Sequence, residues 1–96
     1  MIMTGMTLDE LKETMTTHDE IEFSYCGEMY DFQKDPAESS RIKISVWRCG
    51  DNPECVYSIK IYDGDPFVDD LINAKIFPDG KSIVEGESDI DVEFFT

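Results

Sequence analysis

Basic residues are scarce in this chain of 96 residues, which has eight lysines and arginines against 22 aspartates and glutamates. The formal net charge of −14 is far beyond the roughly 2–8 that is usual for a small soluble domain. Because affinity for phosphate groups comes from lysine and arginine, direct binding to DNA, RNA or an anionic membrane is disfavoured. Repulsion among so many negative charges costs stability, so the excess of acidic residues needs an explanation. A positively charged partner is one explanation, and solubility or a salt-rich niche is a simpler one.

Motifs for catalysis and for membrane insertion are also missing. The chain has one histidine and no Gly-rich phosphate loop, paired-cysteine motif or Ser/His/Asp order, so we predict no enzymatic activity and no cofactor. It has no run of 18 apolar residues, and its start lacks the basic flank and long apolar core of a signal peptide. An odd number of cysteines fits no closed disulfide framework. We therefore expect a cytoplasmic protein.

The length and apolar content favour a single domain over residues 1–96. Hydrophobic residues make up 41% of the chain, with six Phe, four Tyr and one Trp. A chain of this size buries roughly 60–65% of its unfolded surface, which suffices for one modest core. Apolar residues run through the acidic segments as well, so the high charge does not by itself imply disorder.

The first half of the sequence predicts a helix and then a β-hairpin. Thr7 and Glu10 have the spacing of a capping box, and the apolar positions that follow have helical period, so a helix is expected at about 8–17. Over 20–33 the period changes to two, as in half-buried antiparallel strands, and Gly27-Glu28 is the predicted tight turn. The segment after this hairpin is a loop by composition.

The second half predicts another hairpin, a second helix and a last strand. Residues 41–48 and 55–62 alternate around a Gly/Pro turn. Asp65 followed by Pro66 predicts the start of a helix that runs to about Ala74. The final residues alternate apolar and acidic, as in a fifth strand. The order α-β-β-β-β-α-β predicts an α+β domain, with an antiparallel sheet of about five strands and the helices packed on one face.

Acidic residues form two flanks around a mildly basic centre. The first 40 residues and the last 34 each carry −8, whereas the 22 residues between them carry +2. Same-face residues of a strand are about 6.6 Å apart, so Asp89, Asp91 and Glu93 are predicted to form a row that matches alternate nucleic-acid phosphates. We predict a partner-binding surface that imitates a nucleic-acid backbone, with a solvated face as the alternative. Its candidate residues are Asp65, Asp69, Asp70, Glu85, Glu87, Asp89, Asp91, Glu93, Asp19, Glu20 and Glu22.

Metal-ligand spacing is weak in the acidic segment that follows the second hairpin. Carboxylate oxygens, the ligands that hard cations take, are supplied there by four aspartates. Phe67 stands where a third ligand of a calcium loop belongs, and no glycine follows it. We therefore predict no metal site from these residues, which are Asp63, Asp65, Asp69 and Asp70.

The three cysteines and the single histidine are interpreted as structural. No C-x-x-C pattern joins them into a zinc set, so small buried or half-buried thiols are expected at Cys26, Cys49 and Cys55. Cys49 and Cys55 flank the turn of the second hairpin, where a disulfide could form on oxidation. Cys55 is expected to share a sheet face with Tyr57. His18 is expected at the end of the first helix, where a partial positive charge on its ring interacts favourably with the helix dipole.

Three segments resemble a pattern found in small proteins that phages and mobile elements of Firmicutes carry. The segments are Leu8-Asp-Glu-Leu-Lys-Glu, Ile21-Glu-Phe-Ser-Tyr-Cys-Gly-Glu-Met-Tyr, and Asp70-Leu-Ile-Asn-Ala-Lys-Ile with Asp79-Gly-Lys-Ser-Ile. The pattern's hairpin ends in Asn-Gly-Lys, where this chain has Cys26-Gly-Glu28, and Gly86 shortens the last helix. Small acidic proteins from such elements include anti-CRISPR inhibitors that occupy the DNA-binding surface of a Cas nuclease. The resemblance implies such an inhibitor by size, charge and origin, and it carries over no active residue.

Two functional hypotheses follow from the sequence. The first is a non-enzymatic inhibitor in a bacterial host cell, which docks its carboxylates into the basic nucleic-acid channel of a partner protein, most specifically a Cas nuclease. The second is a structural or regulatory interaction module of a mobile element, in which the acid serves solubility and the sheet makes contact through Trp47 and Tyr57. A third hypothesis, a cation-dependent binding domain or enzyme, ranks below both.

Overall fold

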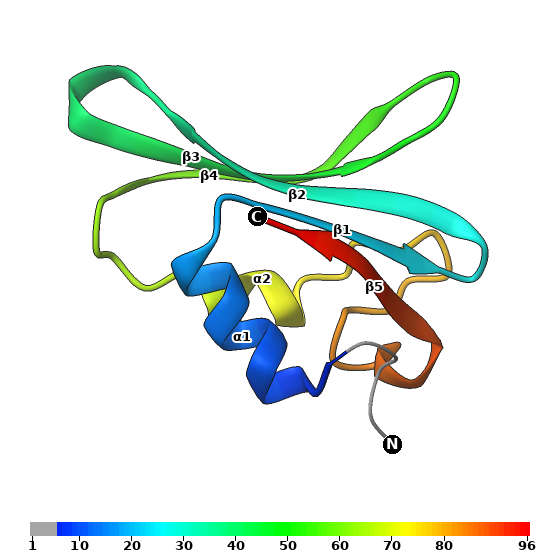
Figure 1. Ribbon diagram of the computed structural model, residues 1–96. Helices are drawn as coiled ribbons and strands as arrows, with labels where there is room; N and C mark the ends of the chain where they lie inside the picture. The colour runs from blue at the N-terminus through cyan, green and yellow to red at the C-terminus, as the bar shows by residue number, and fades with distance from the viewer. Residues whose placement is uncertain (1–5) are drawn as a thin grey trace.

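A five-stranded antiparallel sheet carries both helices on one of its faces in the computed structural model, which describes residues 6–96 (Figure 1). The predicted α+β class is confirmed. In chain order the helices and strands are α1 (Leu8–Thr17), β1 (Glu20–Tyr25), β2 (Glu28–Pro36), β3 (Arg41–Arg48), β4 (Glu54–Tyr62), α2 (Val68–Asn73) and β5 (Ile90–Phe95). Two short helical turns, η1 (Glu38–Ser40) and η2 (Glu87–Asp89), precede β3 and β5.

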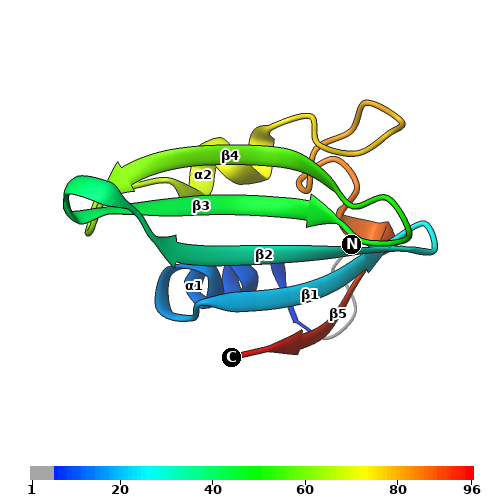
Figure 2. The ribbon, with the colours of Figure 1, turned by 90° about the horizontal axis from the view of Figure 1, so that it is seen from above.

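The last strand lies beside the first in the sheet. The strand order is β4-β3-β2-β1-β5, and every neighbouring pair is antiparallel (Figure 2). The amide N–H of Asp19 donates to the carbonyl of Thr96 at 2.9 Å, and that of Thr96 donates to the carbonyl of Glu20 at 2.9 Å. These bonds bring the two acidic flanks of the sequence together at one edge of the sheet.

Helix α1 begins as predicted, on a complete capping box. The Thr7 hydroxyl accepts from the Glu10 amide at 3.1 Å, and the Glu10 carboxylate accepts from the Thr7 amide at 2.9 Å. The last turn of α1 has no basic residue of its own. Instead Lys34, on the helix side of β2, donates to the carbonyl of Thr16 at 2.8 Å and satisfies one of the free carbonyls at the helix end.

Both hairpins differ from the predicted ones at a single residue. The first turn is Cys26-Gly27, both with positive φ (50° and 84°), as a type I′ turn requires; the predicted turn one residue later is wrong. In the second hairpin, Trp47 pairs with Cys55 but Val46 pairs with Tyr57, so β4 has a bulge. Cys55 therefore lies on the face opposite Tyr57, contrary to the prediction.

Helix α2 starts later than predicted. Its first residue is Val68, and the N-cap position is taken by Phe67, which has no side-chain cap bond. Asp65 does not cap the helix, because its carboxylate accepts from the amide of Tyr62 at 3.0 Å and closes the turn that leaves β4. Phe67 is 8% exposed and its ring stacks at 6.2 Å on that of Phe32, so burial of this ring decides where the helix begins.

The core lies entirely between the sheet and the layer of helices and loops beneath it. Alternate residues of β1 and β2 point into it, together with one side of α1. The segment between α2 and η2 is irregular yet contributes Phe77, whose ring stacks on Tyr25 with centroids 3.8 Å apart. The Tyr25 hydroxyl donates to Asp79 at 2.6 Å, which fixes the same segment from its polar side. The buried hydrophobic residues of the core are Leu11, Met15, Ile21, Phe23, Tyr25, Tyr30, Phe32, Ile44, Val46, Phe67, Leu71, Ile72, Ile76, Phe77, Ile83 and Ile90.

The cysteines are more exposed than predicted. Cys26, Cys49 and Cys55 are all free thiols on the surface, because two of them lie in or next to hairpin turns and the bulge turns the third outward. His18 ends α1 as expected, and its ring meets that of Phe95 edge-on at 5.1 Å. No helix within residues 6–96 is long and apolar enough to cross a membrane.

The ring of Phe77 should be a main source of stability. Phe77 is 3% exposed and packs on Tyr25, Phe23 and Tyr30, so Phe77→Ala removes buried apolar area and leaves a cavity. We expect a loss of about 3–5 kcal/mol in the free energy of unfolding, measured by urea denaturation. Phe94→Ala removes a ring that is 47% exposed and should cost less than about 1 kcal/mol. Similar losses for the two variants would contradict this account of the core.

Candidate functional site

The face of the sheet away from the helices is uncovered, and we call it the open face (Figure 1). Residues of β1 that alternate with the core positions point to it, and so do their partners across the neighbouring strands. Glu22 lies opposite Asp31 of β2, and Asp91 of β5 lies opposite Ser24. We define the acidic sheet patch as Glu20, Glu22, Asp31, Asp91 and Glu93.

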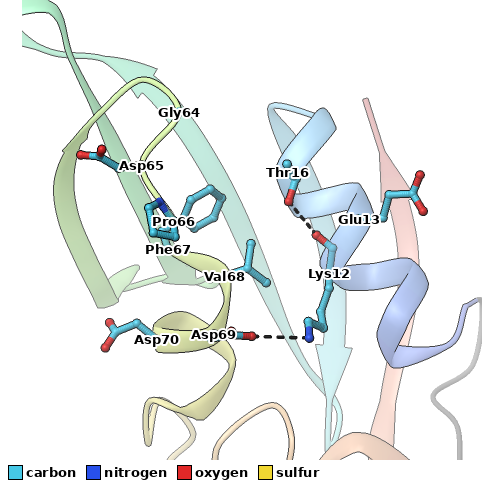
Figure 3. A pocket seen from close by; sticks show the side chains of 10 residues that line it. All are labelled: Lys12, Glu13, Thr16, Gly64, Asp65, Pro66, Phe67, Val68, Asp69 and Asp70. Atoms are coloured by element: carbon cyan, nitrogen blue, oxygen red, sulfur yellow. Dashed lines mark hydrogen bonds and ion pairs between the residues drawn. The ribbon is translucent and has the colours of Figure 1, made fainter.

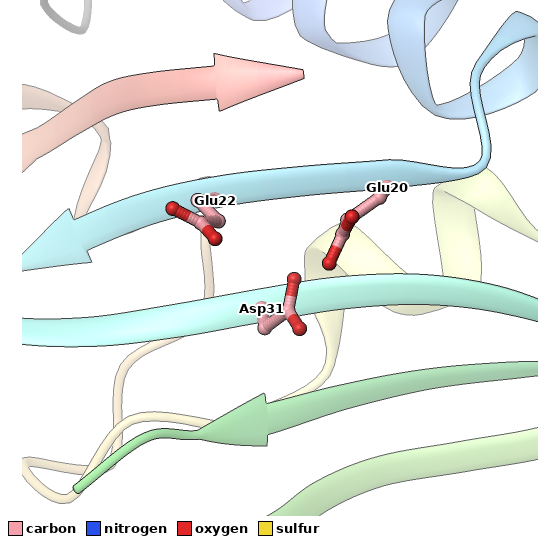
Figure 4. Close-up of side chains that lie close together, drawn as sticks. All are labelled: Glu20, Glu22 and Asp31. Carbon is pink, nitrogen blue, oxygen red and sulfur yellow. The ribbon is translucent and has the colours of Figure 1, made fainter. Parts of the chain in front are cut away.

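Three members of this patch, from β1 and β2, point toward one another (Figure 4). One carboxylate oxygen from each of Glu20, Glu22 and Asp31 lies within 4.8 Å of the other two. The Oδ2 atom of Asp31 accepts from the side-chain amide of Gln33 at 2.6 Å. The Oδ1 atom of Asp31 is buried and has no hydrogen-bond partner within residues 6–96. A buried carboxylate oxygen without a donor is unfavourable, so this group gains from any donor or cation that reaches it.

Mutual repulsion within the patch raises the pKa values of two of its members. The pKa of Glu20 is raised above its ordinary value, first by the negative charge of Asp31 and then by loss of hydration. The pKa of Glu93 is raised mainly by the negative charge of Asp91. Within residues 6–96, no lysine or arginine forms an ion pair with any carboxylate of the patch. The patch is therefore an uncompensated negative charge.

The chemistry of the patch suits a cation. Carboxylate oxygens at this spacing could ligate a hard divalent ion such as Ca²⁺ or Mg²⁺, and they could equally accept hydrogen bonds from an ammonium or guanidinium group. Trp47 of β3 lies opposite Asp31 on the same face and is half-buried. An aromatic ring beside carboxylates is also a surface on which a guanidinium can stack. The patch has no nucleophile paired with a base.

The predicted site residues on the helix side already have protein partners. Asp69 pairs with Lys12 at 3.5 Å, and Asp70 accepts from the hydroxyl of Tyr57 at 2.6 Å. Burial of the Tyr57 hydroxyl, and then its bond to Asp70, raise the pKa of Tyr57. Glu85 forms an ion pair with Lys75, which lowers the pKa of the Glu85 carboxyl. These bonds, and that of Asp65 to the backbone, tie the helix-side carboxylates to separate parts of the fold.

A groove lies between α1 and the segment Gly64–Asp70, and three of the predicted residues line it (Figure 3). Its volume is about 480 Å³. Pro66, Phe67 and Val68 form an apolar wall, and the ion pair between Lys12 and Asp69 crosses it. This groove is on the layer opposite the acidic sheet patch, so the predicted residues do not form one surface.

The remaining predicted residues lie around β5 and differ from the expected row. Asp89 belongs to η2 and is not in the strand. The β1–β5 register shifts so that Val92 faces Phe23 but Phe94 faces Glu22, which places Glu93 at a bulge. The evenly spaced row of three carboxylates is therefore wrong, and only Asp91 and Glu93 join the patch. Glu87 and Asp89 lie in the turn before β5, and Asp19 lies just before β1.

Sequence reasoning missed Asp31, the residue that makes the patch a cluster. The signal was present, because a Cys26-Gly27 turn of type I′ sets Glu22 opposite Asp31, and only the assignment of the turn one residue later concealed it. The hypothesis of an aromatic contact through Trp47 and Tyr57 is also corrected, since the bulge in β4 leaves the two rings on opposite faces of the sheet. Comparisons with protein-family models, curated proteins and solved structures found no match to this chain.

Removal of one charge from the cluster should stabilise the protein. The folded-state pKa of Glu20 is raised above its ordinary value of 4.5, so the folded state takes up a proton more readily than the unfolded state does. The contribution of Glu20 to stability therefore falls as the pH rises through the window just above 4.5. We expect Glu20→Gln to raise the free energy of unfolding at pH 7 by up to about 1 kcal/mol and to flatten its dependence on pH in that window.

The matched control for this change is Glu13→Gln. It alters the net charge equally, but Glu13 is an exposed residue of α1 outside the patch. Urea denaturation of both variants from pH 4 to pH 8 compares them. An equal gain in stability from both would mean that the effect is the overall charge of the protein and not repulsion inside the cluster.

Proposed function

We propose that this protein is a non-enzymatic inhibitor that binds a basic nucleic-acid-binding surface of a partner protein through the acidic sheet patch. The observation that carries the proposal is the state of these five carboxylates. They crowd on an uncovered sheet face, they have no ion-pair partner within residues 6–96, and the repulsion among them raises the pKa values of Glu20 and Glu93. Cations of a partner would relieve this repulsion in the bound state.

The mechanism we propose is competition for the partner's lysine and arginine side chains. Those side chains would release their counterions on meeting the patch, as they do on meeting phosphates. The protein itself, with a net charge of −14, is repelled by nucleic acid, so it can occupy such a surface without bridging it to DNA or RNA. Opposite charge also speeds the encounter between the two proteins.

Mimicry in this proposal takes the form of a two-dimensional patch instead of a single row. Neighbouring strands are about 4.8 Å apart and same-face residues of a strand about 6.6 Å apart, so β5, β1 and β2 spread the charges in two dimensions. Along a strand, the spacing of about 6.6 Å is close to the rise of about 6.8 Å between alternate phosphates of one nucleic-acid strand. The arrangement of Glu22 opposite Asp31 and Asp91 opposite Ser24 produces this spread. The most specific target that we propose is a Cas nuclease in the cytoplasm of a bacterial host cell.

Reversal of the patch should abolish this interaction. The test variant is Glu20→Lys, Glu22→Lys and Asp91→Lys in combination. We expect affinity capture from cells with a type II CRISPR system to retain a nucleic-acid-binding protein at low salt, and the variant to bind it at least about a hundredfold more weakly, since like charges across an interface cost several kcal/mol. Binding of the unaltered protein should weaken steeply between low and physiological salt, and it should inhibit DNA cleavage by the captured nuclease.

A charge-matched control separates the patch from the net charge. The combination Asp9→Lys, Asp51→Lys and Asp63→Lys makes the same change at exposed positions outside the patch and the groove. This control should keep most of the binding. If no nucleic-acid-binding protein is captured at low salt, or if both combinations act alike, the proposal is wrong.

A further inference from the structure

The groove between α1 and Gly64–Asp70 has an apolar interior, and we call it the anchor groove. Its inner wall is Phe67, which is 8% exposed, and its outer wall is made by the half-buried Val68 and by Pro66. Thr16 of α1 faces them across the groove (Figure 3). A volume of about 480 Å³ is large enough for an aromatic or branched aliphatic side chain together with the chain atoms beside it.

Charged residues lie at the inner end of this groove and on its outer flanks. A smaller cavity of about 130 Å³ shares Thr16, Gly64, Asp65 and Phe67 with it and leads under the sheet to Lys34. The Lys34 ammonium lies 5.6 Å from the centre of the Phe67 ring, and Asp63 and Asp65 line the same cavity, so the inner end holds charges of both signs. The outer flanks carry Glu13 on one side and Asp65 and Asp70 on the other, and Figure 3 shows these carboxylates pointing away from the apolar walls.

The ion pair that crosses the groove is weak enough to be displaced. The side chains of Lys12 and Asp69 are 41% and 85% exposed, and their charged atoms are 3.5 Å apart. Exposed pairs of this kind contribute about 0–1 kcal/mol. A cation from a partner could therefore take the place of Lys12 beside Asp69, while the apolar walls remain.

The anchor groove could supply the buried apolar contacts that the acidic sheet patch lacks. Charges at the rim of an interface speed association and set specificity, but most affinity comes from a few well-buried aromatic or aliphatic anchors. On the open face the exposed Phe94 of β5 and the half-buried Trp47 of β3 lie apart, whereas the groove offers three adjacent apolar side chains with acid on both flanks. A groove that is apolar inside and acidic outside is complementary to a polypeptide segment that has an apolar side chain with basic side chains on both sides of it.

We propose that the anchor groove binds a basic amphipathic segment of the partner protein, in which one aromatic or branched aliphatic side chain is flanked by lysine or arginine. The inference rests on the proposed function and names the chemistry of the partner's second contact. The apolar side chain enters against Phe67 and Val68, and the flanking cations meet Glu13 on one side and Asp65 and Asp70 on the other. One cation displaces Lys12 from Asp69.

Three small molecules with a common indole ring test this without the partner. Tryptamine carries a positive charge, indole-3-acetamide is neutral and indole-3-acetate is negative. In ¹H–¹⁵N NMR titrations we expect tryptamine to shift the signals of Thr16, Gly64 and Val68 with a dissociation constant on the order of millimolar. Indole-3-acetamide should bind more weakly and indole-3-acetate roughly tenfold more weakly than tryptamine, because the flanks are acidic.

Matched variants place the binding in the groove. Thr16→Phe fills it with a ring, whereas Thr17→Phe puts the same ring on the exposed neighbour; each change removes one hydroxyl bond of 3.0 Å to a helix carbonyl. Tryptamine binding should be lost in Thr16→Phe and kept in Thr17→Phe. Val68→Thr keeps the shape and charge of the wall but makes it polar, so it should weaken tryptamine several-fold even if Thr16→Phe fails to fold.

The outcomes separate this inference from the proposed function. Equal binding of tryptamine and indole-3-acetate, or shifts spread over every acidic surface, would overturn the anchor groove. If reversal of the acidic sheet patch abolishes capture but Thr16→Phe and Val68→Thr leave it unchanged, the proposed function stands and the groove is no anchor. If no basic partner is captured at low salt, both fall together.

Discussion

The sheet can bury only one of its faces, and the rest of the structure depends on this constraint. Within residues 6–96, two short helices and the irregular segment after α2 cover a sheet of five strands, and all of them lie on the same side. The stack of Phe77 on Tyr25 closes the end of the core that no helix covers. Because the core draws most of the apolar residues to that side, the other face is left to mainly polar residues, with Trp47 and Phe94 among them.

One-sided burial divides the 22 acidic residues into two chemical groups. Those on the helix side face hydroxyls, amides and lysines, so Asp70 and Glu85 serve the fold through Tyr57 and Lys75. Those of the acidic sheet patch lie beside other carboxylates. Net charge alone does not distinguish the two groups, whereas the position of each residue in the strand register does. Because the acidic sheet patch has no ion-pair partner within residues 6–96, a cationic partner could stabilise it most.

The sequence allowed the elements to be predicted well but the registers poorly. The capping box of Thr7 and Glu10, the alternation of the strands and the α+β class are local signals, and the structure confirms them. The errors are shifts of one or two residues: the turn at Cys26-Gly27, the bulges in β4 and β5, and the late start of α2 at Val68. A bulge or a turn type is set by how side chains pack across strands, so composition and period do not reveal it. Since the period of a strand is two, each such shift decides which face a side chain joins, and this is why Asp31 was missed.

The acidic sheet patch and the anchor groove lie on opposite layers of the protein, and this separation limits what a partner can be. A flat basic surface could reach one of them but not both, because the sheet and the core stand between them. A channel or cleft with basic walls could reach both, with one wall on β1, β2 and β5 and the other against α1 and α2. Nucleic-acid channels have this shape and this charge. The proposed function and the proposed anchor are therefore compatible only for a partner that encloses the protein. A partner that binds a single face would contact either the charges of the patch or the apolar wall of the groove, but not both.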